Sequence, residues 1–82
     1  MINIIEFGAP WCPACLQQEP ITKEFCKERG YELEVINVDL GHPLVEQYSI
    51  ASLPTIMIFS NGELLHTIVG FTPKRELEKY EL

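Results

Sequence analysis

The 82-residue sequence predicts an α/β fold, with a mixed four-stranded sheet and helices on its faces. Apolar, strand-like runs alternate with helix-like segments in the order β-α-β-α-β-β-α. Asn61-Gly62 separates the last two apolar runs, and Asn-Gly in this position indicates a tight hairpin. The two strand–helix–strand passages predict parallel pairing of the first strands, and the hairpin adds an antiparallel end.

The expected strands are short segments rich in β-branched and aromatic residues. They cover residues 2–7, 32–38, 56–60 and 63–69. The first of them is mostly β-branched and aromatic and lacks the regular alternation of apolar and polar residues that marks a half-exposed strand. We therefore expect it to be buried on both faces. Gly8-Ala9-Pro10 ends it.

A long helix is expected from Cys12 to about Arg29. Pro13 suits its first turn, where a missing backbone N–H costs nothing, and Gly30 is a natural stop. Pro20 falls inside the segment, and we expect it to kink the helix because it removes a hydrogen bond and crowds the preceding turn.

Two shorter helices complete the expected order. The segment 41–49 should form one of them, with an apolar side made of Leu44, Val45 and Tyr48. The other should begin at Thr72-Pro73, with the Thr72 side chain as its cap, and continue to the C-terminus.

Composition restricts the class of protein. The length fits one domain, residues 1–82, and 12 acidic against 6 basic residues give a net charge of −6. That charge argues against binding to nucleic acid or to an anionic membrane, and we expect a monomer. No apolar run could span a bilayer and no leader peptide is recognisable. Three cysteines are too few for a disulfide framework, so we expect a cytoplasmic protein whose cysteines are reduced or cycling.

Trp11-Cys12-Pro13-Ala14-Cys15 contains the residues with the clearest chemistry. Two residues three apart on a helix have Cα atoms about 5 Å apart, which suits a disulfide. Cys12 begins the helix, where free N–H groups favour an anion, so its pKa should fall below about 8.5 and its sulfur should be the more exposed. Cys12 would attack a disulfide, and the more deeply placed Cys15 would resolve the resulting mixed disulfide.

The third cysteine and the two histidines predict no metal site. Cys26 lies about 16 Å beyond Cys15 along the same face of the helix, so we expect a core residue, with a regulatory thiol as the alternative. Zinc needs four ligands, and Cys26, His42 and His66 lie on separate elements.

These features together resemble the thioredoxin superfamily over essentially the whole chain. The resemblance rests on motifs in the expected order: Glu6-Phe7, Trp11-Cys12-Pro13-Ala14-Cys15, Pro20, Asn37-Val38-Asp39, Leu53-Pro54-Thr55, Asn61-Gly62-Glu63 and Val69-Gly70. Typical members begin with an additional strand and helix, which this sequence lacks, so it is similar to a minimal version of the fold.

The resemblance implies a thiol–disulfide oxidoreductase that reduces protein disulfides in electron transport and cell redox homeostasis. Its redox-active disulfide, Cys12–Cys15, would be the only cofactor, with the same order of attack and resolution. Its partners would be disulfide-containing proteins and a recharging enzyme such as thioredoxin reductase.

Glu6 is the charged residue with the most informative position. Strand alternation places it on the face of Ile2 and Ile4, under the first helix, where burial should raise its pKa. The resemblance implies an acid here that exchanges protons with Cys15; the alternative is that Glu6 reaches solvent. Typical members carry Asp at this position and many carry a nearby Lys, where this sequence has Val35.

The resemblance also implies a substrate surface. Pro54 matches the cis-proline of the family, and the backbone of Leu53 would be open to an extended substrate strand. An apolar rim around Cys12 would consist of Trp11, Pro13, Ala14, Leu53, Gly70 and Phe71. The alternatives are core packing for Trp11 and Phe71 and strand termination for Gly70.

Three other functions remain open from sequence. Proline-first Cys12-Pro13-Ala14-Cys15 favours a glutaredoxin-like redoxin or a donor to ribonucleotide reductase, although Val69-Gly70-Phe71-Thr72 lacks the expected Gly-Gly-x-Asp pattern. A non-catalytic binding adaptor is possible because fold does not determine function. An oxidant is the third, and an acid at Glu6 opposes it by disfavouring the thiolate.

Overall fold

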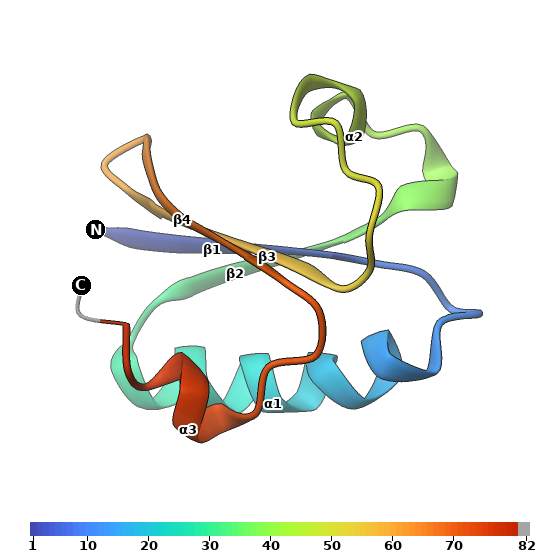
Figure 1. Ribbon diagram of the computed structural model, residues 1–82. Helices are drawn as coiled ribbons and strands as arrows, with labels where there is room; N and C mark the ends of the chain where they lie inside the picture. The colour runs from blue at the N-terminus through green and yellow to red at the C-terminus, as the bar shows by residue number, and fades with distance from the viewer. Residues whose placement is uncertain (81–82) are drawn as a thin grey trace.

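The chain folds into strands and helices in the predicted order (Figure 1). The computed structural model describes residues 1–80. In chain order the elements are β1 (Ile2–Gly8), α1 (Pro13–Arg29), β2 (Glu32–Asn37), a 3₁₀ turn (Val38–Leu40), α2 (Pro43–Gln47), β3 (Thr55–Ser60), β4 (Glu63–Val69) and α3 (Lys74–Leu77). The 3₁₀ turn was not predicted, and the predicted order of the strands and α-helices is confirmed.

The strands form one mixed sheet in the order β2-β1-β3-β4. β1 pairs in parallel with β2, so that Ile4 lies opposite Leu33, and antiparallel with β3, so that Ile4 also lies opposite Ile58. With a neighbour on each side, β1 is an interior strand, and Ile4, Glu6 and Phe7 are all buried. This agrees with the expectation that the first strand is covered on both faces.

The direction of β3 differs from the prediction. Parallel pairing, which both strand–helix–strand passages predict, holds for β1 and β2 but is wrong for β3. The cause is the connection between β2 and β3. Its helix, α2, has five residues and rises only about 7.5 Å, whereas a six-residue strand extends for about 20 Å. The connection therefore does not return along the strands. β3 starts at the same end of the sheet at which β2 finishes.

The helices cover the two faces of the sheet unequally. Figure 1 shows α1 and α3 side by side under one face, while α2 alone lies over the other face. Strand alternation supplies one apolar layer to each side. The α1 layer contains Ile4, Phe25, Cys26, Ile56, Ile58, Ile68 and Leu77, and the α2 layer is built on Phe7, Ile36 and Met57.

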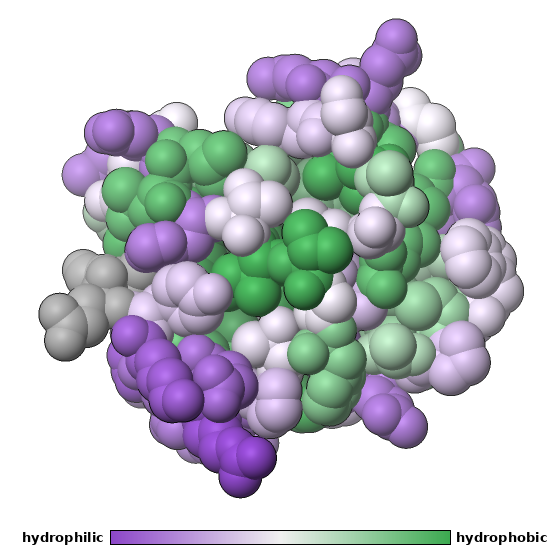
Figure 2. All heavy atoms as spheres, viewed as in Figure 1, coloured by the Kyte–Doolittle hydropathy of each residue, from purple (hydrophilic) through white to green (hydrophobic). Residues whose placement is uncertain are grey.

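Hydrophobic side chains show in the middle of the space-filling view in Figure 2, at the level of the sheet. Hydrophilic side chains gather over α2 at the top and around α3 at the lower left.

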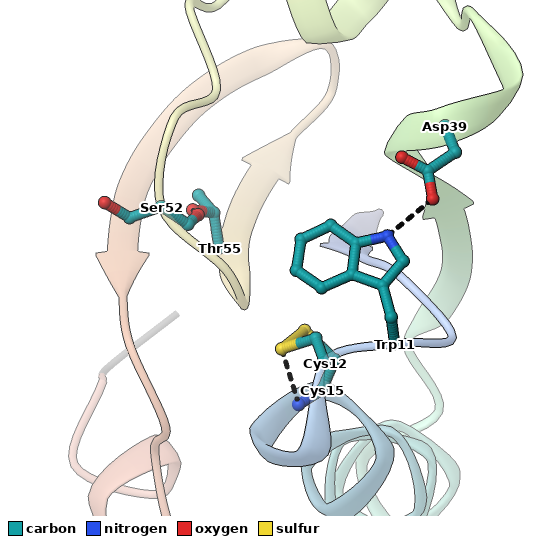
Figure 3. Close-up of a disulfide and its surroundings, with 6 residues drawn as sticks. All are labelled: Trp11, Cys12, Cys15, Asp39, Ser52 and Thr55. Atoms are coloured by element: carbon teal, nitrogen blue, oxygen red, sulfur yellow. Dashed lines mark hydrogen bonds between the residues drawn. A yellow bond between two sulfur atoms is a disulfide. The ribbon is translucent and has the colours of Figure 1, made fainter.

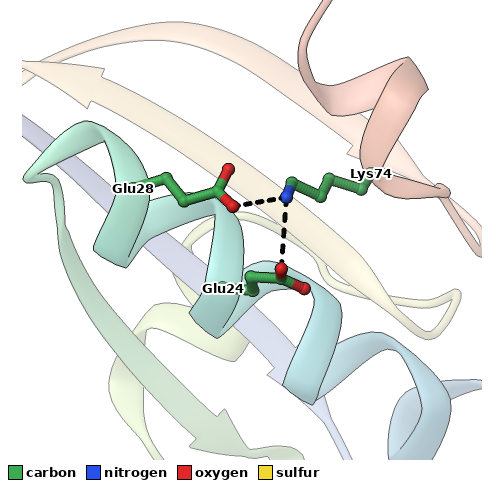
Figure 4. A network of polar contacts seen from close by, with 3 residues as sticks. All are labelled: Glu24, Glu28 and Lys74. Carbon is green, nitrogen blue, oxygen red and sulfur yellow. Dashed lines mark hydrogen bonds and ion pairs between the residues drawn. The ribbon is translucent and has the colours of Figure 1, made fainter.

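Ion pairs connect α3 to α1. Lys74 Nζ pairs with Glu24, at 3.2 Å, and with Glu28 (Figure 4). Within residues 1–80, no helix is long and apolar enough to cross a membrane.

Proline and glycine delimit α1 as predicted. The helix begins at Pro13, contains Pro20, and ends at Gly30, whose φ of 71° lies in the left-handed region. The hairpin is also confirmed. Asn61 and Gly62 have φ of 50° and 85°, as a tight two-residue turn between β3 and β4 requires.

The two short helices are shorter than expected. α2 spans Pro43–Gln47, because the ring of His42 caps it by accepting a hydrogen bond from Leu44 N–H at 3.2 Å. The predicted cap of the last helix is wrong, since α3 follows Pro73 with no side-chain cap. The Thr72 hydroxyl instead donates to Gly70 O at 3.0 Å. α3 ends at Leu77, and the predicted continuation over residues 81–82 lies outside the described residues.

Candidate active site

Cys12 and Cys15 form a disulfide at the start of α1, with their Cα atoms 5.2 Å apart (Figure 3). Cys12 is the residue just before the helix and has extended backbone angles, and its sulfur accepts a hydrogen bond from Cys15 N–H at 3.2 Å. The first helical turn contains no acidic side chain. Free N–H groups and the helix dipole therefore favour negative charge on the Cys12 sulfur when the disulfide is reduced.

The two cysteines are covered to nearly the same degree. Cys12 is 8% exposed and Cys15 is 5% exposed, so the expected order holds by a narrow margin. Ala9 is buried with them, and partly buried Leu53 packs against the group. A substrate sulfur must therefore approach Cys12 across the side chains that surround it.

Gly8, at the end of β1, determines how closely Cys15 lies against the sheet. A Cβ atom at position 8 would lie 3.2 Å from Cys15 Cβ and 3.4 Å from its sulfur, which is tighter than ordinary side-chain contact. The sequence suggests only that Gly8 ends the strand, because glycine in such a position does not reveal which residue approaches it.

Glu6 is buried under α1, as predicted. It is 1% exposed, and its Oε1 has no hydrogen-bond partner among the described residues. Burial raises the pKa of the carboxyl; the Thr22 hydroxyl lowers it, the charge of Glu19 raises it, and the charge of Lys23 lowers it, in decreasing order. The alternative in which Glu6 reaches solvent is wrong.

A pocket of about 230 Å³ connects Glu6 with Cys15, since both line it. Glu19 and Val35 line it as well. Val35 is 40% exposed and occupies the place where the family resemblance leads us to expect a lysine. Glu6 and Cys15 thus line one cavity, and β2 contributes an aliphatic side chain to it instead of a cation.

The loop that contains Leu53 packs against the disulfide and is joined to a second loop. The Leu53–Pro54 peptide bond is cis, as the resemblance implies, and Pro54 is buried. Pro54 O accepts a hydrogen bond from Gly70 N–H at 2.8 Å, which joins this loop to the one that follows β4. Leu53 N–H and C=O make no hydrogen bond within residues 1–80, so this stretch of backbone is open to an added strand.

Aromatic side chains lie exposed in this region. Trp11 is 66% exposed and Phe71 is 45% exposed, so the alternative of core packing is wrong for both. The Trp11 indole N–H donates to Asp39 Oδ2 at 2.7 Å, and Figure 3 shows the ring between Asp39 and the disulfide. Asp39 was not predicted as a site residue, because an acid after a strand carries no signal of its partner.

Cys26 is a core residue, as expected. It is 3% exposed, and burial, followed by the charge of Glu6, raises its pKa to about 11. The histidines are engaged elsewhere: His42 caps α2 and the His66 ring packs edge-on against Tyr80, with centroids 4.9 Å apart. No three metal-binding side chains come together within the described residues 1–80.

A buried polar group that the sequence analysis missed lies one turn beyond Cys15. Gln18 is completely buried, and its amide hydrogen-bonds the backbone of Thr72, 54 residues away. Thr22, also buried, receives a further hydrogen bond from Gln18. A polar residue in a helix normally indicates a solvated face, so the pattern of α1 alone does not identify these residues.

Comparison with known proteins agrees with this geometry. A family model described as thioredoxin matches residues 1–81. The chain belongs to the thioredoxin family. It is 32% identical to the thioredoxin of Bacillus subtilis, over 95% of the chain and 77% of that protein. For thioredoxin 1 of Synechococcus elongatus the identity is 36%, over 90% of the chain and 71% of that protein.

Solved thioredoxin structures share the fold. A mutant thioredoxin from Halobacterium salinarum matches with a TM-score of 0.87 and 26% identity, over 94% of the chain and 68% of its own. Thioredoxin-2 of a malaria parasite matches with a TM-score of 0.86 and 28% identity, over 94% and 77%. Family membership and the paired cysteines together indicate a thiol–disulfide oxidoreductase, whose family uses no cofactor beyond the active-site disulfide.

The burial of Glu6 predicts a pH-dependent stability. The native carboxyl keeps its proton above its ordinary pKa of 4.5, where the unfolded chain has lost it. Its favourable contribution is therefore present at low pH and is lost as the pH rises through the raised native pKa. We expect Glu6→Leu to raise the free energy of unfolding at pH 7 by about 1–3 kcal/mol, the cost of an unpaired buried polar group, and by less at pH 4.

Urea unfolding of the oxidised protein at both pH values measures this difference. Glu32→Leu is the matched control, because it removes the same charge from an exposed position on β2. A gain for Glu6→Leu that does not depend on pH would contradict the expected effect of the buried carboxyl.

The raised pKa of Cys26 predicts selective alkylation. With a pKa of about 11, this thiol is almost entirely protonated at pH 8, and it is also covered. We expect iodoacetamide to modify Cys12 of the reduced native protein while Cys26 stays unmodified, as peptide mass mapping would show. In 6 M guanidinium all the cysteines should react, and equal labelling of Cys12 and Cys26 in the native protein would refute the prediction.

Proposed function

We propose that the chain reduces disulfide bonds in protein substrates. The reduced Cys12 thiolate attacks one sulfur of a substrate disulfide, forming a mixed disulfide and releasing the other sulfur as a thiolate that takes up a proton. Cys15, as a thiolate, then attacks the Cys12 sulfur and releases the second substrate thiol. Two electrons pass to the substrate, and the Cys12–Cys15 disulfide remains.

The observation that carries this proposal is the disulfide at the start of a 17-residue helix, with Cys12 as the residue before it. Cys15 N–H already donates to the Cys12 sulfur in the oxidised protein. The same donor would stabilise the Cys12 thiolate, which makes Cys12 the nucleophile and a good leaving group. Cys15 has no such position at the helix end, so it suits the resolving step.

Glu6 is the proposed acceptor of the Cys15 proton. Both residues line the pocket of about 230 Å³, and burial raises the pKa of the carboxyl towards that of a thiol. A general base works best when its pKa is close to the working pH. Because Oε1 has no partner among residues 1–80, it is available to receive a proton through the pocket.

The proposed substrate surface consists of residues next to the cysteines in the chain and of residues in the two loops joined by the Gly70–Pro54 hydrogen bond. Trp11, Pro13 and Phe71 are exposed, while Leu53 and Gly70 are partly buried and Pro54 is buried. An extended peptide would pair with the open backbone of Leu53, and its side chains would contact the exposed rings. This surface suits flexible segments of proteins better than a small disulfide.

The proposed context is that of the bacterial thioredoxins that the chain resembles. We infer one domain over residues 1–82, acting as a cytoplasmic monomer in electron transport and cell redox homeostasis. A chloroplastic thioredoxin of spinach is also similar, at 37% identity over 94% of the chain and 46% of that protein. The net charge of −6 supports the absence of nucleic-acid and membrane partners.

Substitution of each cysteine tests the order of attack. We expect Cys12→Ser to abolish reduction of insulin disulfides, because no nucleophile remains. Cys15→Ser should still attack and should accumulate as a mixed disulfide, which non-reducing electrophoresis and mass spectrometry detect. Cys26→Ala is the control and should retain activity.

The result also separates the proposal from a binding adaptor. An adaptor would keep its full biological activity when Cys12 and Cys15 are both replaced by serine. Trapping through Cys15 instead of Cys12 would reverse the proposed roles.

The source of electrons distinguishes a thioredoxin from a glutaredoxin-like redoxin. We expect NADPH and thioredoxin reductase to sustain insulin reduction, and glutathione with glutathione reductase to support it at least about tenfold less well, a difference of about 1.4 kcal/mol in the limiting step. The measurement is NADPH oxidation under matched concentrations. Faster turnover with glutathione would favour the glutaredoxin-like alternative, including a donor to ribonucleotide reductase.

A further inference from the structure

Gln18 joins the redox helix to the loop that follows β4. Its Nε2 donates to Thr72 O at 2.9 Å, and Thr72 N–H donates to its Oε1 at 2.7 Å. The side-chain amide therefore pairs with the Thr72 backbone as one strand pairs with the next. Gln18 is completely buried and Thr72 is 7% exposed, so water does not compete for these hydrogen bonds.

The hydrogen bonds continue from Thr72 to the disulfide-bordering loops. Thr72 Oγ1 donates to Gly70 O at 3.0 Å, and Gly70 N–H donates to Pro54 O at 2.8 Å. Gly70 has a φ of 92°, which only glycine adopts readily, so the loop turns sharply at this position. One series of contacts thus connects α1, the Gly70–Thr72 loop and the Leu53–Pro54 loop.

Gln18 uses both of its donors. The second Nε2 hydrogen bond goes to Thr22 Oγ1 at 3.1 Å, and that hydroxyl in turn donates to the Gln18 backbone O at 3.1 Å. The hydrogen bonds with Thr22, on the same helix, therefore hold the Gln18 side chain in the orientation that contacts Thr72. A methionine would fill the same volume but would leave Thr72 N–H and C=O buried without partners.

The ion pairs between α1 and this part of the chain are weaker than the hydrogen bonds of Gln18. Lys74 pairs with Glu24 and Glu28, and the three side chains are 30%, 62% and 46% exposed. Ion pairs this exposed contribute little to stability because water and salt screen them. The buried amide of Gln18 is thus the stronger of these two polar contacts between α1 and the chain after β4.

We propose that Gln18 is a positioning residue for protein substrates, holding Gly70 and Phe71 in place beside the disulfide. The inference rests on the proposed function, in which those two residues belong to the substrate surface. Gln18 bonds to neither sulfur, so it acts through the Thr72 backbone. A loop that is already ordered loses less conformational entropy when a substrate binds, so the substrate binds more tightly.

This role predicts a difference between large and small substrates. An extended peptide contacts the loop as well as Cys12, so its KM depends on where the loop lies. A small aromatic disulfide, dithiobisnitrobenzoate, needs only access to Cys12. Loss of Gln18 should therefore raise KM for a protein disulfide and leave the chemical steps unchanged.

The test compares Gln18→Met with Gln17→Met, its exposed neighbour on the same helix. With insulin as substrate we expect Gln18→Met to raise KM about two- to tenfold, which corresponds to ordering one or two residues on binding, with kcat within about twofold. The rate with dithiobisnitrobenzoate should stay within about twofold for both variants. Gln17→Met should match the unsubstituted protein in every assay.

Amide hydrogen exchange tests the contact itself. Thr72 N–H should be protected in the unsubstituted protein and in Gln17→Met, and should lose that protection in Gln18→Met, while the amides of Phe25 and Cys26 keep theirs. If Gln18→Met does not fold, Gln18→Glu replaces it, because a buried carboxyl that keeps its proton accepts from Thr72 N–H and donates to Thr72 O but has no second donor for Thr22 Oγ1. That variant should show a smaller rise in KM.

The outcomes are distinguishable. An unchanged KM for insulin together with lost Thr72 protection would overturn the positioning role, and retained protection in Gln18→Met would overturn the contact. If the unsubstituted protein reduces dithiobisnitrobenzoate but not insulin, the proposed function fails, and the positioning role for protein substrates fails with it. Thr72 exchange then still decides whether Gln18 holds the loop.

Discussion

The contact between Gly8 and Cys15 sets the distance between the redox helix and the sheet. A Cβ atom at position 8 would lie 3.2 Å from Cys15 Cβ, so Cys15 would have to shift by a few tenths of an ångström to accommodate it. Cys15 and Glu6 line the same pocket at this place. The absence of a side chain at the end of β1 therefore allows the disulfide and the buried carboxyl to occupy one small space. Alternation along β1 places Gly8, Glu6 and Ile4 on the α1 face. This one interior strand therefore contributes the glycine that contacts Cys15, the buried carboxyl and part of the apolar core under α1.

Most of the fold was predictable because its signals are local. Pro13 and Gly30 delimit α1, and Asn61-Gly62 forms the hairpin, since each depends on the backbone preferences of one or two residues. The direction of β3 was not predictable in this way. It depends on how far the connection after β2 travels, and α2 proved too short to carry the chain back along the sheet. The Thr72 cap failed for a related reason: its hydroxyl had a better partner in Gly70 O, which helix-capping preferences do not consider.

The reactive residues of the candidate site were predictable from sequence, but the residues that hydrogen-bond to their neighbours were not. The cysteine pair, the buried acid and the cis-proline follow from motifs and from resemblance to the family, and the structure places each where it was expected. Gln18 and Asp39 were missed because their partners are distant in sequence: Thr72 lies 54 residues from Gln18, and Trp11 lies 28 residues from Asp39. A single sequence shows that a residue is polar, but the partner that justifies its burial appears only when the chain is folded.

The side chains around Glu6 determine how strongly its buried carboxyl holds a proton. Cys26 lies in the same layer, and its raised pKa of about 11 keeps it protonated near neutral pH, in part because Glu6 carries charge nearby. In the proposed mechanism, Cys26 would therefore not compete with Glu6 for the proton that leaves Cys15. Gln18 and Thr22 surround this region with groups that hydrogen-bond but do not titrate, and the Thr22 hydroxyl lowers the pKa of Glu6. Because burial is the larger effect, the carboxyl remains a stronger base than an exposed glutamate, at the expense of native stability near neutral pH. Glu6 Oε1 has no hydrogen-bond partner within residues 1–80, and the packing of Ile4, Phe25 and their apolar neighbours stabilises the fold around it.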